Sequence, residues 1–417
     1  MEVSELSQEN LVVVGASLAG LRAVEAARKA GFTGGITLIG AEDHLPYDRP
    51  PLSKAYLEQL PNGAGPASTT FRTEEILRDE LGVELILGTP ATGLDTEGQR
   101  VLVGDHTIAY DALVIATGAH ARMLPDSAGL SGVYTLRTLD DAIAIRQALE
   151  AGARTVVVGA GFIGSEVAAG ARKRGLDVTI LEALPTPLVR AVGERMGAAC
   201  AALHERNGTP LRCGVGVQGL EGDGRVERVL LTDGTSVEAD LVVVGIGTIP
   251  TTGWLEGSGL RLDNGVVCDA TLWTGVGRVY AAGDVARWHN PLFDRLMRLE
   301  HWTSAAEQGA LAAKNALNPE AATSYQTVPY FWSDWYDSRI QFVGVPTADE
   351  IEVVEGDPDV DERWVALYRE GDRLAGALTL NGQNVIMKYR GLLMRKASWG
   401  EALAFAAARR TDVVSSS

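Results

Sequence analysis

The sequence has few cysteines, and none of the three lies close to another. Cys200, Cys213 and Cys268 form no C-x-x-C or C-x4-C pair. Enzymes that carry electrons through thiol–disulfide exchange need two neighbouring cysteines, so this chemistry is excluded. We expect the three thiols to be buried or incidental, and no pattern of residues predicts a metal site.

The sequence is also short of basic charge and of long apolar runs. It has 37 lysines and arginines against 54 aspartates and glutamates, a formal net charge of −17, which argues against nucleic acid as a partner. No apolar run approaches the roughly 18 residues that a membrane-spanning helix needs. Residues 1–10 carry three glutamates and no basic residue, unlike a secretory signal or a transit peptide. We therefore expect a cytoplasmic protein that has no membrane partner.

The residues that are present are typical of a globular α/β protein with several domains. The chain has 417 residues, more than one hydrophobic core normally organises, so two or three domains are expected. Hydrophobic residues make up 46% of the chain and charged residues 22%, and its 48 glycines indicate many tight turns.

Two glycine-rich turns of the same kind begin 144 residues apart. Residues 15–20 read GASLAG and residues 159–164 read GAGFIG; each follows a short run rich in valine and precedes an alanine-rich segment. Such a strand, turn and helix bind a pyrophosphate, because the glycines allow close backbone approach and the helix N-terminus offers free N–H groups. Two copies in one chain predict that two dinucleotides are held at once, as in an enzyme that passes electrons from a nicotinamide to a flavin.

The second turn is the complete one. It contains Gly159, Gly161 and Gly164, and Glu182 follows 18 residues later at the end of the next predicted strand. A carboxylate at that place accepts hydrogen bonds from both ribose hydroxyls and repels a 2′-phosphate, so we expect NADH rather than NADPH. The alternative is a glycine turn that serves packing alone.

The first turn departs from the pattern. Ser17 stands at the middle glycine position, and the acidic residue comes late, at Glu42. Ser17 still permits close approach of the backbone, and its hydroxyl can donate to a phosphate oxygen. We assign this turn to a resident FAD, with Glu42 either as the ribose ligand or as a solvated loop carboxylate.

The repeat of the turn organises the chain. We expect an α/β fold with two Rossmann-like dinucleotide-binding domains, followed by a smaller α+β domain in which clustered aromatic residues and alternating runs suggest an antiparallel sheet. The expected boundaries are an FAD-binding domain at 8–118 and 248–324, an NAD-binding domain at 119–247, and a C-terminal α+β domain at 325–417.

Several further motifs carry a family resemblance. In order and spacing, YDRPPLSK at 47–54, ATGA at 116–119, GIGTIP at 245–250, YAAGD at 280–284 and YFWSDWYD at 330–337 resemble the NADH-dependent ferredoxin reductases of bacterial oxygenase systems and, more distantly, apoptosis-inducing factor. The resemblance runs from about Asn10 to Gly400 and implies a glutathione-reductase-like fold that holds FAD and NADH.

The resemblance also implies the site residues. Lys54, beside the flavin, and Glu166, near the nicotinamide, correspond to a catalytic pair; a surface lysine and a helix-face glutamate are the alternatives. The implied FAD contacts are Gly15, Ala16, Ser17, Gly20, Glu42, Arg49, Lys54, Ala91, Thr117, Gly118, Arg137, Gly283, Asp284, Trp302 and Trp332. The implied NAD contacts are Gly159, Gly161, Phe162, Ile163, Gly164, Glu166, Glu182 and Gly247. For the two tryptophans the alternative is an aromatic core, and for Arg137 it is an interdomain ion pair.

With no cysteine pair, electrons have to leave the flavin for a docked protein. The resemblance implies an iron–sulfur ferredoxin, of the [2Fe-2S] type, that serves a cytochrome P-450-type monooxygenase or a ring-hydroxylating dioxygenase. Two basic clusters are candidate docking sites, with solvated basic faces as the alternative. The first contains Arg287, Arg295 and Arg298, and the second contains Lys388, Arg390, Arg395, Lys396, Arg409 and Arg410.

Other functions stay open from the sequence. A rubredoxin reductase or an NADH oxidase that forms hydrogen peroxide would need the same two cofactors. A non-enzymatic alternative is an NADH-sensing interaction protein of the apoptosis-inducing type. The sequence does not decide between a monomer and a dimer.

Overall fold

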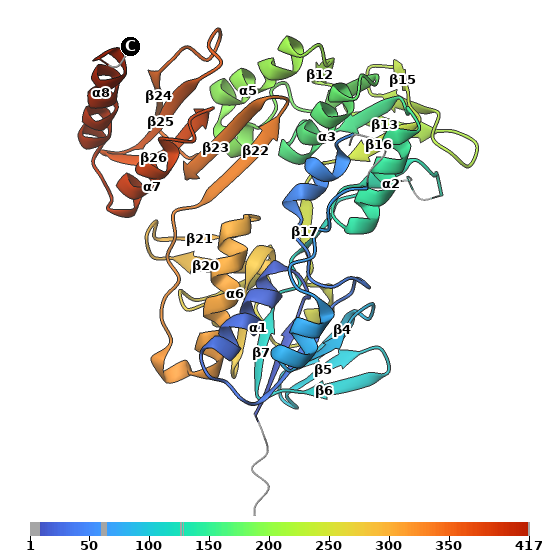
Figure 1. The fold of residues 1–417 in the computed structure, drawn as a ribbon, viewed down its shortest axis with the longest axis vertical. Coiled ribbons are helices and arrows are strands. Elements are labelled where there is room, and N and C mark those ends of the chain that lie inside the picture. Colours follow the sequence, from blue (N-terminus) through green and yellow to red (C-terminus); the bar gives the residue numbers. More distant parts are fainter. Residues whose placement is uncertain (1–8, 60–64, 126, 128, 416–417) are drawn as a thin grey trace, which may run out of the picture. The chain divides into compact units, whose positions relative to one another are not determined.

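The structure, a computed structural model, describes residues 9–59, 65–125, 127 and 129–415, without the side chains of 410–415 (Figure 1). The chain divides into two compact units. Unit 1 comprises Met1–Asp48, Ser68–His120 and Ile249–Thr327, and unit 2 comprises Arg49–Ala67, Ala121–Thr248 and Val328–Ser417. The chain passes from one unit to the other five times, and two of these crossings lie in the short strands β8 (Ala119–Ala121) and β17 (Thr248–Pro250). The four-part domain division expected from the sequence stays a prediction.

Unit 1 is built on a parallel sheet with the strand order β19-β7-β1-β2-β3. The central strand β1 (Asn10–Val14) is buried from Leu11 to Val14, as expected of a β-branched run between two neighbouring strands. The other strands of the sheet are β2 (Gly35–Ile39), β3 (Val83–Ile86), β7 (Ala112–Ile115) and β19 (Val279–Ala281).

Two helices of unit 1 pack closely against each other. They are α1 (Leu18–Lys29) and α6 (Trp302–Leu317). A Cβ atom at Gly309 on α6 would lie 2.1 Å from the carbonyl oxygen of Ala19 on α1, so only glycine allows this approach. Smaller elements complete the unit: the antiparallel sheet of β4 (Ala91–Asp95), β5 (Arg100–Val103) and β6 (His106–Ala109), a second small sheet of β18 (Val266–Cys268), β20 (Ala286–Asn290) and β21 (Arg295–Met297), and the short helix Ile76–Glu80.

Unit 2 contains a second parallel sheet, with the strand order β12-β11-β10-β16-β9. Its strands are β9 (Val133–Thr135), β10 (Thr155–Val158), β11 (Val178–Glu182), β12 (Leu211–Cys213) and β16 (Leu241–Val244). Its helices are α2 (Leu139–Glu150), α3 (Phe162–Lys173), α4 (Val189–Val192) and α5 (Glu194–Arg206), and an antiparallel sheet of β13 (Val217–Glu221), β14 (Arg228–Leu231) and β15 (Ser236–Glu238) is attached. The first residues of unit 2 form two short 3-10 helices, Pro50–Ser53 and Ala55–Leu57.

The last part of unit 2 is an antiparallel sheet with the order β22-β23-β26-β25-β24 and two helices. The strands are β22 (Tyr330–Trp335), β23 (Ser338–Gly344), β24 (Glu350–Glu355), β25 (Trp364–Glu370) and β26 (Arg373–Leu380); the helices are α7 (Ile386–Met394) and α8 (Trp399–Ser415). The predicted fold class, two Rossmann-like sheets plus a C-terminal α+β domain, is confirmed. Within the described residues, no helix combines the length and the apolar character that crossing a bilayer requires.

Candidate functional site

The first glycine turn connects β1 to α1 in unit 1. Gly15 has φ +121°, and a Cβ atom there would lie 2.1 Å from the carbonyl oxygen of Ala116. A Cβ atom at Gly20 would lie 1.9 Å from the oxygen of Gly15, so both positions require glycine. Ser17 occupies the N-cap of α1, and the first turn of this helix carries no acidic residue. The helix therefore begins with N–H groups that have no acceptor within the helix and with no negative charge in its first turn, which fits a pyrophosphate.

The second turn, between β10 and α3 in unit 2, leaves space at one glycine. A Cβ atom at Gly159 would lie 2.5 Å from the oxygen of Gly245, and one at Gly164 would lie 2.4 Å from the oxygen of Gly159. By contrast, the nearest atom to a Cβ at Gly161 is 3.8 Å away. Contacts within the protein thus explain why Gly159 and Gly164 are glycines, but they do not explain Gly161. A side chain at Gly161 would instead occupy the space in front of the N-terminus of α3. This space is what a dinucleotide phosphate needs.

Glu182 is held in a fixed place beside the second turn. It ends β11, and its two carboxylate oxygens accept hydrogen bonds from the backbone N–H groups of Ala160, at 3.0 Å, and Leu184, at 2.9 Å. Cys213 pairs with it across the sheet, and burial, with the Glu182 charge adding to it, raises the pKa of that thiol. The carboxylate therefore lies at the carboxyl edge of the sheet, where the sequence places a ribose ligand.

The flavin contacts expected in unit 1 come from the carboxyl ends of its parallel strands. Thr117 and Gly118 follow β7, and the Thr117 hydroxyl donates to the Thr251 carbonyl over 2.9 Å. Gly283 and Asp284 follow β19, and the N–H of Gly283 donates to the side chain of Gln308 over 2.8 Å. Because β7 runs parallel to β1 and β19 runs parallel to β7, these residues and the first glycine turn share one edge of the sheet.

Four more of the expected flavin contacts lie in unit 1. Glu42, just after β2, accepts a hydrogen bond of 2.5 Å from the hydroxyl of Tyr47. Trp302, the first residue of α6, donates through Nε1 to Asp48 over 2.7 Å. Ala91 begins β4, and Ala16 follows Gly15 in the turn.

The remaining expected flavin contacts belong to unit 2. Arg49 donates to the backbone carbonyl of Arg137 over 2.5 Å, and the N–H of Arg137 donates to Asp141 over 2.8 Å. Trp332 on β22 stacks against Tyr330, with the ring centroids 5.7 Å apart. The assignment of these residues to the flavin stays a prediction, as does that of the unit 1 residues.

Lys54 and Glu166 form a buried ion pair inside unit 2. The Lys54 Nζ atom lies 2.8 Å from Oε1 of Glu166, whose side chain is only 3% exposed. The same carboxylate accepts hydrogen bonds from the hydroxyls of Ser53 and Ser333, each 2.5 Å long, and from the N–H of Asp334 at 3.1 Å. The pair thus exists as the sequence predicts, but the serines that surround it were not predicted. No local pattern reveals them, because they lie 113 and 167 residues from Glu166.

A second buried polar cluster lies behind α3 and was also missed by the sequence analysis. His204 on α5 is bonded to the hydroxyl of Tyr336 at 2.8 Å and to that of Ser165 at 3.1 Å, and Tyr336 donates to Thr209 over 2.8 Å. Burial lowers the pKa of His204 to about 4. A lone histidine on a helix gives no sign of such a cluster in the sequence.

Three other expected NAD contacts differ in their surroundings. The ring of Phe162 packs on Phe331, with centroids 4.8 Å apart, so this side chain belongs to the contact between α3 and the C-terminal sheet. Ile163 is 45% exposed at the start of α3 and is open to a ligand. Gly247 has φ +101°, and its carbonyl accepts the N–H of Arg122.

The two predicted basic clusters differ in how their charges are compensated. In unit 1, Arg287 forms an ion pair with Asp263, Arg298 forms one with Glu300, and Arg295 donates to a backbone carbonyl. Near α7 in unit 2, Arg390 donates to the carbonyl of Val328. Arg409 lies over the ring of Phe405, whereas the side chain of Arg410 lies outside the described residues.

Basic side chains on and directly after α7 are exposed and are not compensated by ion pairs with described residues. Lys388, Arg395 and Lys396 are exposed, and within the described residues none of the three makes an ion pair. Lys388 lies on α7, and Arg395 and Lys396 directly follow its last residue; Met387 and Met394 of α7 are 45% and 43% exposed. We call these five residues the α7 face.

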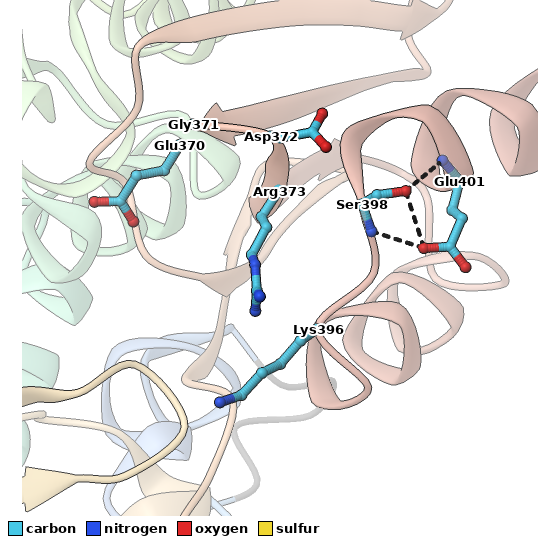
Figure 2. A pocket seen from close by; sticks show the side chains of 7 residues that line it. All are labelled: Glu370, Gly371, Asp372, Arg373, Lys396, Ser398 and Glu401. Atoms are coloured by element: carbon cyan, nitrogen blue, oxygen red, sulfur yellow. Dashed lines mark hydrogen bonds between the residues drawn. The ribbon is translucent and has the colours of Figure 1, made fainter.

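A groove next to the α7 face is lined by side chains of both signs (Figure 2). Figure 2 shows the side chains of Arg373 and Lys396 on one side of it, and Ser398 is hydrogen-bonded to Glu401 at the start of α8. Its lining residues are Glu370, Gly371, Asp372, Arg373, Lys396, Ser398 and Glu401. This mixture suits no charged ligand of one sign.

Comparisons with known proteins agree with the geometry of the two turns. The pyridine nucleotide-disulphide oxidoreductase family matches residues 9–309, and the reductase C-terminal family matches residues 330–411. Rhodocoxin reductase of Rhodococcus erythropolis is 38% identical over 92% of this chain and 89% of its own length. The ferredoxin–NAD(+) reductase component of the anthranilate 1,2-dioxygenase system of Burkholderia cepacia is 38% identical over 85% of this chain and 86% of its own length. The crystal structure of the covalent putidaredoxin reductase–putidaredoxin complex is similar over 93% of both chains, with a TM-score of 0.87 and 34% identity.

Proposed function

This chain belongs to the pyridine nucleotide-disulphide oxidoreductase family, and we propose that it is an FAD-containing, NADH-dependent ferredoxin reductase. It would supply electrons to an oxygenase system of the kind found in bacteria. Its relatives include rhodocoxin reductase and the reductase component of a dioxygenase system, and its fold is similar to that of putidaredoxin reductase in a covalent complex with putidaredoxin. The observation that carries the proposal is the buried Lys54–Glu166 pair at the NAD-type glycine turn, in a chain that has no pair of neighbouring cysteines.

The residues of each unit fit one of the two cofactors. The turn at Gly15, with Glu42 and the strand ends of unit 1, would hold FAD, while the turn at Gly159, with Glu182, would hold NADH. When bound, FAD accepts electrons from NADH in pairs and releases them singly, which is what a one-electron acceptor requires. Glu182 selects against NADPH, because its carboxylate is fixed by two backbone N–H groups and cannot turn away from a 2′-phosphate.

Two side chains of the protein, Lys54 and Glu166, place a positive charge at a fixed position in the site. Lys54 brings an ammonium group, and Glu166 keeps that group in place through the 2.8 Å ion pair. The burial of Glu166 keeps water from its carboxylate, which strengthens the interaction between the two charges. Lys54 is 21% exposed on its side chain, so one side of it stays accessible to a ligand.

The acceptor is proposed to be an acidic ferredoxin that docks on the α7 face. The arginines of the unit 1 cluster are already engaged with acids or carbonyl groups, whereas Lys388, Arg395 and Lys396 form no ion pair with any residue that the structure describes. A ferredoxin of this kind would pass electrons to a cytochrome P-450-type monooxygenase or to a ring-hydroxylating dioxygenase. The cytoplasmic location predicted from the sequence belongs to this proposal.

Stopped-flow absorbance under anaerobic conditions tests the proposal. The purified protein should be yellow, NADH should bleach the flavin absorbance much faster than NADPH does, and an added [2Fe-2S] ferredoxin should restore it. Rapid return of the absorbance with air alone would identify a hydrogen peroxide-forming oxidase, and return with rubredoxin alone would identify a rubredoxin reductase. If NADH bleaches the flavin and no acceptor restores the absorbance quickly, the NADH-sensing role is favoured. A colourless protein that takes up no FAD would contradict all of these functions.

A further inference from the structure

The Glu166 carboxylate is surrounded by donors from two separate segments of unit 2. It lies on α3 and is 4% exposed. Ser53 and Lys54 come from the segment at the start of the unit, and Ser333 and the N–H of Asp334 come from β22. Three of these donors, Lys54, Ser333 and the N–H of Asp334, contact Oε1, and Ser53 contacts Oε2, so both oxygens of the carboxylate are engaged.

The hydroxyl of Ser333 can point in only one useful direction. Its oxygen accepts a hydrogen bond of 2.8 Å from Nε1 of Trp335, and an indole nitrogen can only donate. The single hydroxyl proton of Ser333 is therefore directed to Glu166, at 2.5 Å. Ser333 is fully buried, so no water competes for this proton.

The hydroxyl proton of Ser53 is also directed to Glu166, to the other oxygen of the carboxylate. Its hydroxyl is 2.5 Å from Oε2 of Glu166 and 3.5 Å from the carbonyl oxygen of Pro50. Because a hydroxyl has one proton and a hydrogen bond to a charged acceptor is the stronger one, that proton goes to Glu166. Ser53 is 6% exposed and directly precedes Lys54, so its position also limits where the lysine can lie.

The two serines therefore hold the two oxygens of one carboxylate. Ser53 holds Oε2, whereas Ser333 holds Oε1, the oxygen that also contacts the Lys54 ammonium. Rotation of the carboxylate would break both bonds at once. We infer that Ser53 and Ser333 are positioning residues, a serine clamp that fixes Glu166 and through it the Lys54 ammonium for the reaction of NADH with FAD. The role in this reaction rests on the proposed function.

The serine clamp is tested with Ser53→Ala, Ser333→Ala and the double variant. Ser165→Ala is the matched control, because Ser165 is a fully buried serine next to Glu166 that is bonded to His204 instead. Ser333→Thr retains a hydroxyl and Ser333→Cys does not, and both keep the site filled if an alanine variant fails to fold.

The first readout is the reactivity of the Lys54 amine toward acetic anhydride, measured by peptide mass spectrometry on the FAD-loaded protein without NADH. Hydrogen bonds to a charged group contribute substantially to holding that group in place. Losing both serines should therefore loosen the Glu166 carboxylate and the Lys54 amine that it binds, and raise the rate of Lys54 acetylation about tenfold. Each single variant should show a smaller rise. Ser165→Ala and Ser333→Thr should react like the parent protein. This readout needs neither NADH nor a ferredoxin, so it judges the serine clamp even if the proposed function fails.

The second readout is the reduction of the flavin by NADH in the stopped-flow experiment. The limiting rate of flavin reduction should fall about tenfold in the double variant. The NADH concentration that gives the half-maximal rate and the midpoint of thermal unfolding should be the same in the double variant as in the Ser165→Ala control. Ser333→Thr should recover the parent rate and Ser333→Cys should not. An unchanged rate of Lys54 acetylation in the double variant overturns the inference, and so does an equal rate loss in Ser165→Ala. If the parent protein is not reduced by NADH, the proposed function fails instead.

Discussion

The imidazole ring of His204 lies nearly parallel to the indole ring of Trp335, with the ring centroids 4.8 Å apart and 24° between the planes. Both ring nitrogens of His204 have hydroxyl partners, in Tyr336 and Ser165. The histidine is thus enclosed between an aromatic face and two neutral hydroxyls, an environment that favours the neutral imidazole.

The first prediction concerns stability in acid. Burial lowers the pKa of His204 in unit 2 and of His301 in unit 1 to about 4. Between about pH 6.5 and pH 4 the unfolded chain binds protons at these residues and the folded protein does not, so the stability contributed by the neutral rings is complete above pH 6.5 and is lost as the pH falls. Each histidine contributes about 3 kcal/mol to this loss.

Thermal unfolding followed by circular dichroism between pH 8 and pH 4 measures this effect. His204→Gln removes one titrating group, so its midpoint should fall less steeply with decreasing pH than that of the parent protein. Equal slopes for the two proteins would contradict the assignment of the proton uptake to His204.

The second prediction separates two glycines of the same turn. Gly164→Ala places a methyl group 2.4 Å from a backbone oxygen and should lower the thermal midpoint strongly, whereas Gly161→Ala meets nothing closer than 3.8 Å. Gly161→Ala should therefore keep the protein folded, at a cost of no more than about 1 kcal/mol, and weaken NADH binding. Isothermal titration with NADH and thermal unfolding of both variants check this. Parent-like NADH affinity in Gly161→Ala would show that the space at this turn is not the phosphate site.

The third prediction concerns the choice of nucleotide. Glu182→Gln keeps the shape of the side chain and removes the negative charge, so the preference for NADH over NADPH should shrink about tenfold in kcat/KM, the equivalent of 1.4 kcal/mol. Glu205→Gln, at an exposed site on α5, is the control and should leave the preference unchanged. The measurement is the reduction of the bound flavin by each nucleotide over a range of concentrations.

The fourth prediction concerns the ferredoxin. Reversing Arg395 and Lys396 to glutamate should slow ferredoxin reduction about tenfold at low ionic strength, with a smaller difference at high salt, because charges on a docking surface act on association. Reduction of the flavin by NADH should not change. An unaltered rate of ferredoxin reduction at low salt would rule out the α7 face as the docking surface. Reversing Arg298 is a poor control, since it would break the ion pair with Glu300.

The sequence predicts those parts of the site that depend on residues close together in the chain. Gly15, Gly159 and Glu182 follow from a local strand, turn and helix, and the structure places each at the carboxyl edge of a parallel sheet. The Lys54–Glu166 pair follows from the family resemblance, and the structure brings the two residues together.

The parts that the sequence does not predict depend on contacts between distant segments. Ser333 resembles any other serine in a strand until β22 packs against α3. Phe162 follows the glycine pattern of a nucleotide contact, yet its ring packs on Phe331. The sequence near Arg287 contains several basic residues and therefore predicts a docking surface. Only the fold shows that Asp263 forms an ion pair with Arg287.

The position of Ser333 on the last sheet has a consequence for how the protein is made. A ribosome has to add 167 residues after Glu166 before it reaches Ser333, and until then Glu166 and Lys54 lack half of their hydrogen-bonded surroundings. A growing chain can complete both glycine turns while Glu166 still lacks the two donors that β22 supplies. A chain that ends before β22 would therefore contain both nucleotide-binding turns without the complete set of hydrogen bonds around Glu166.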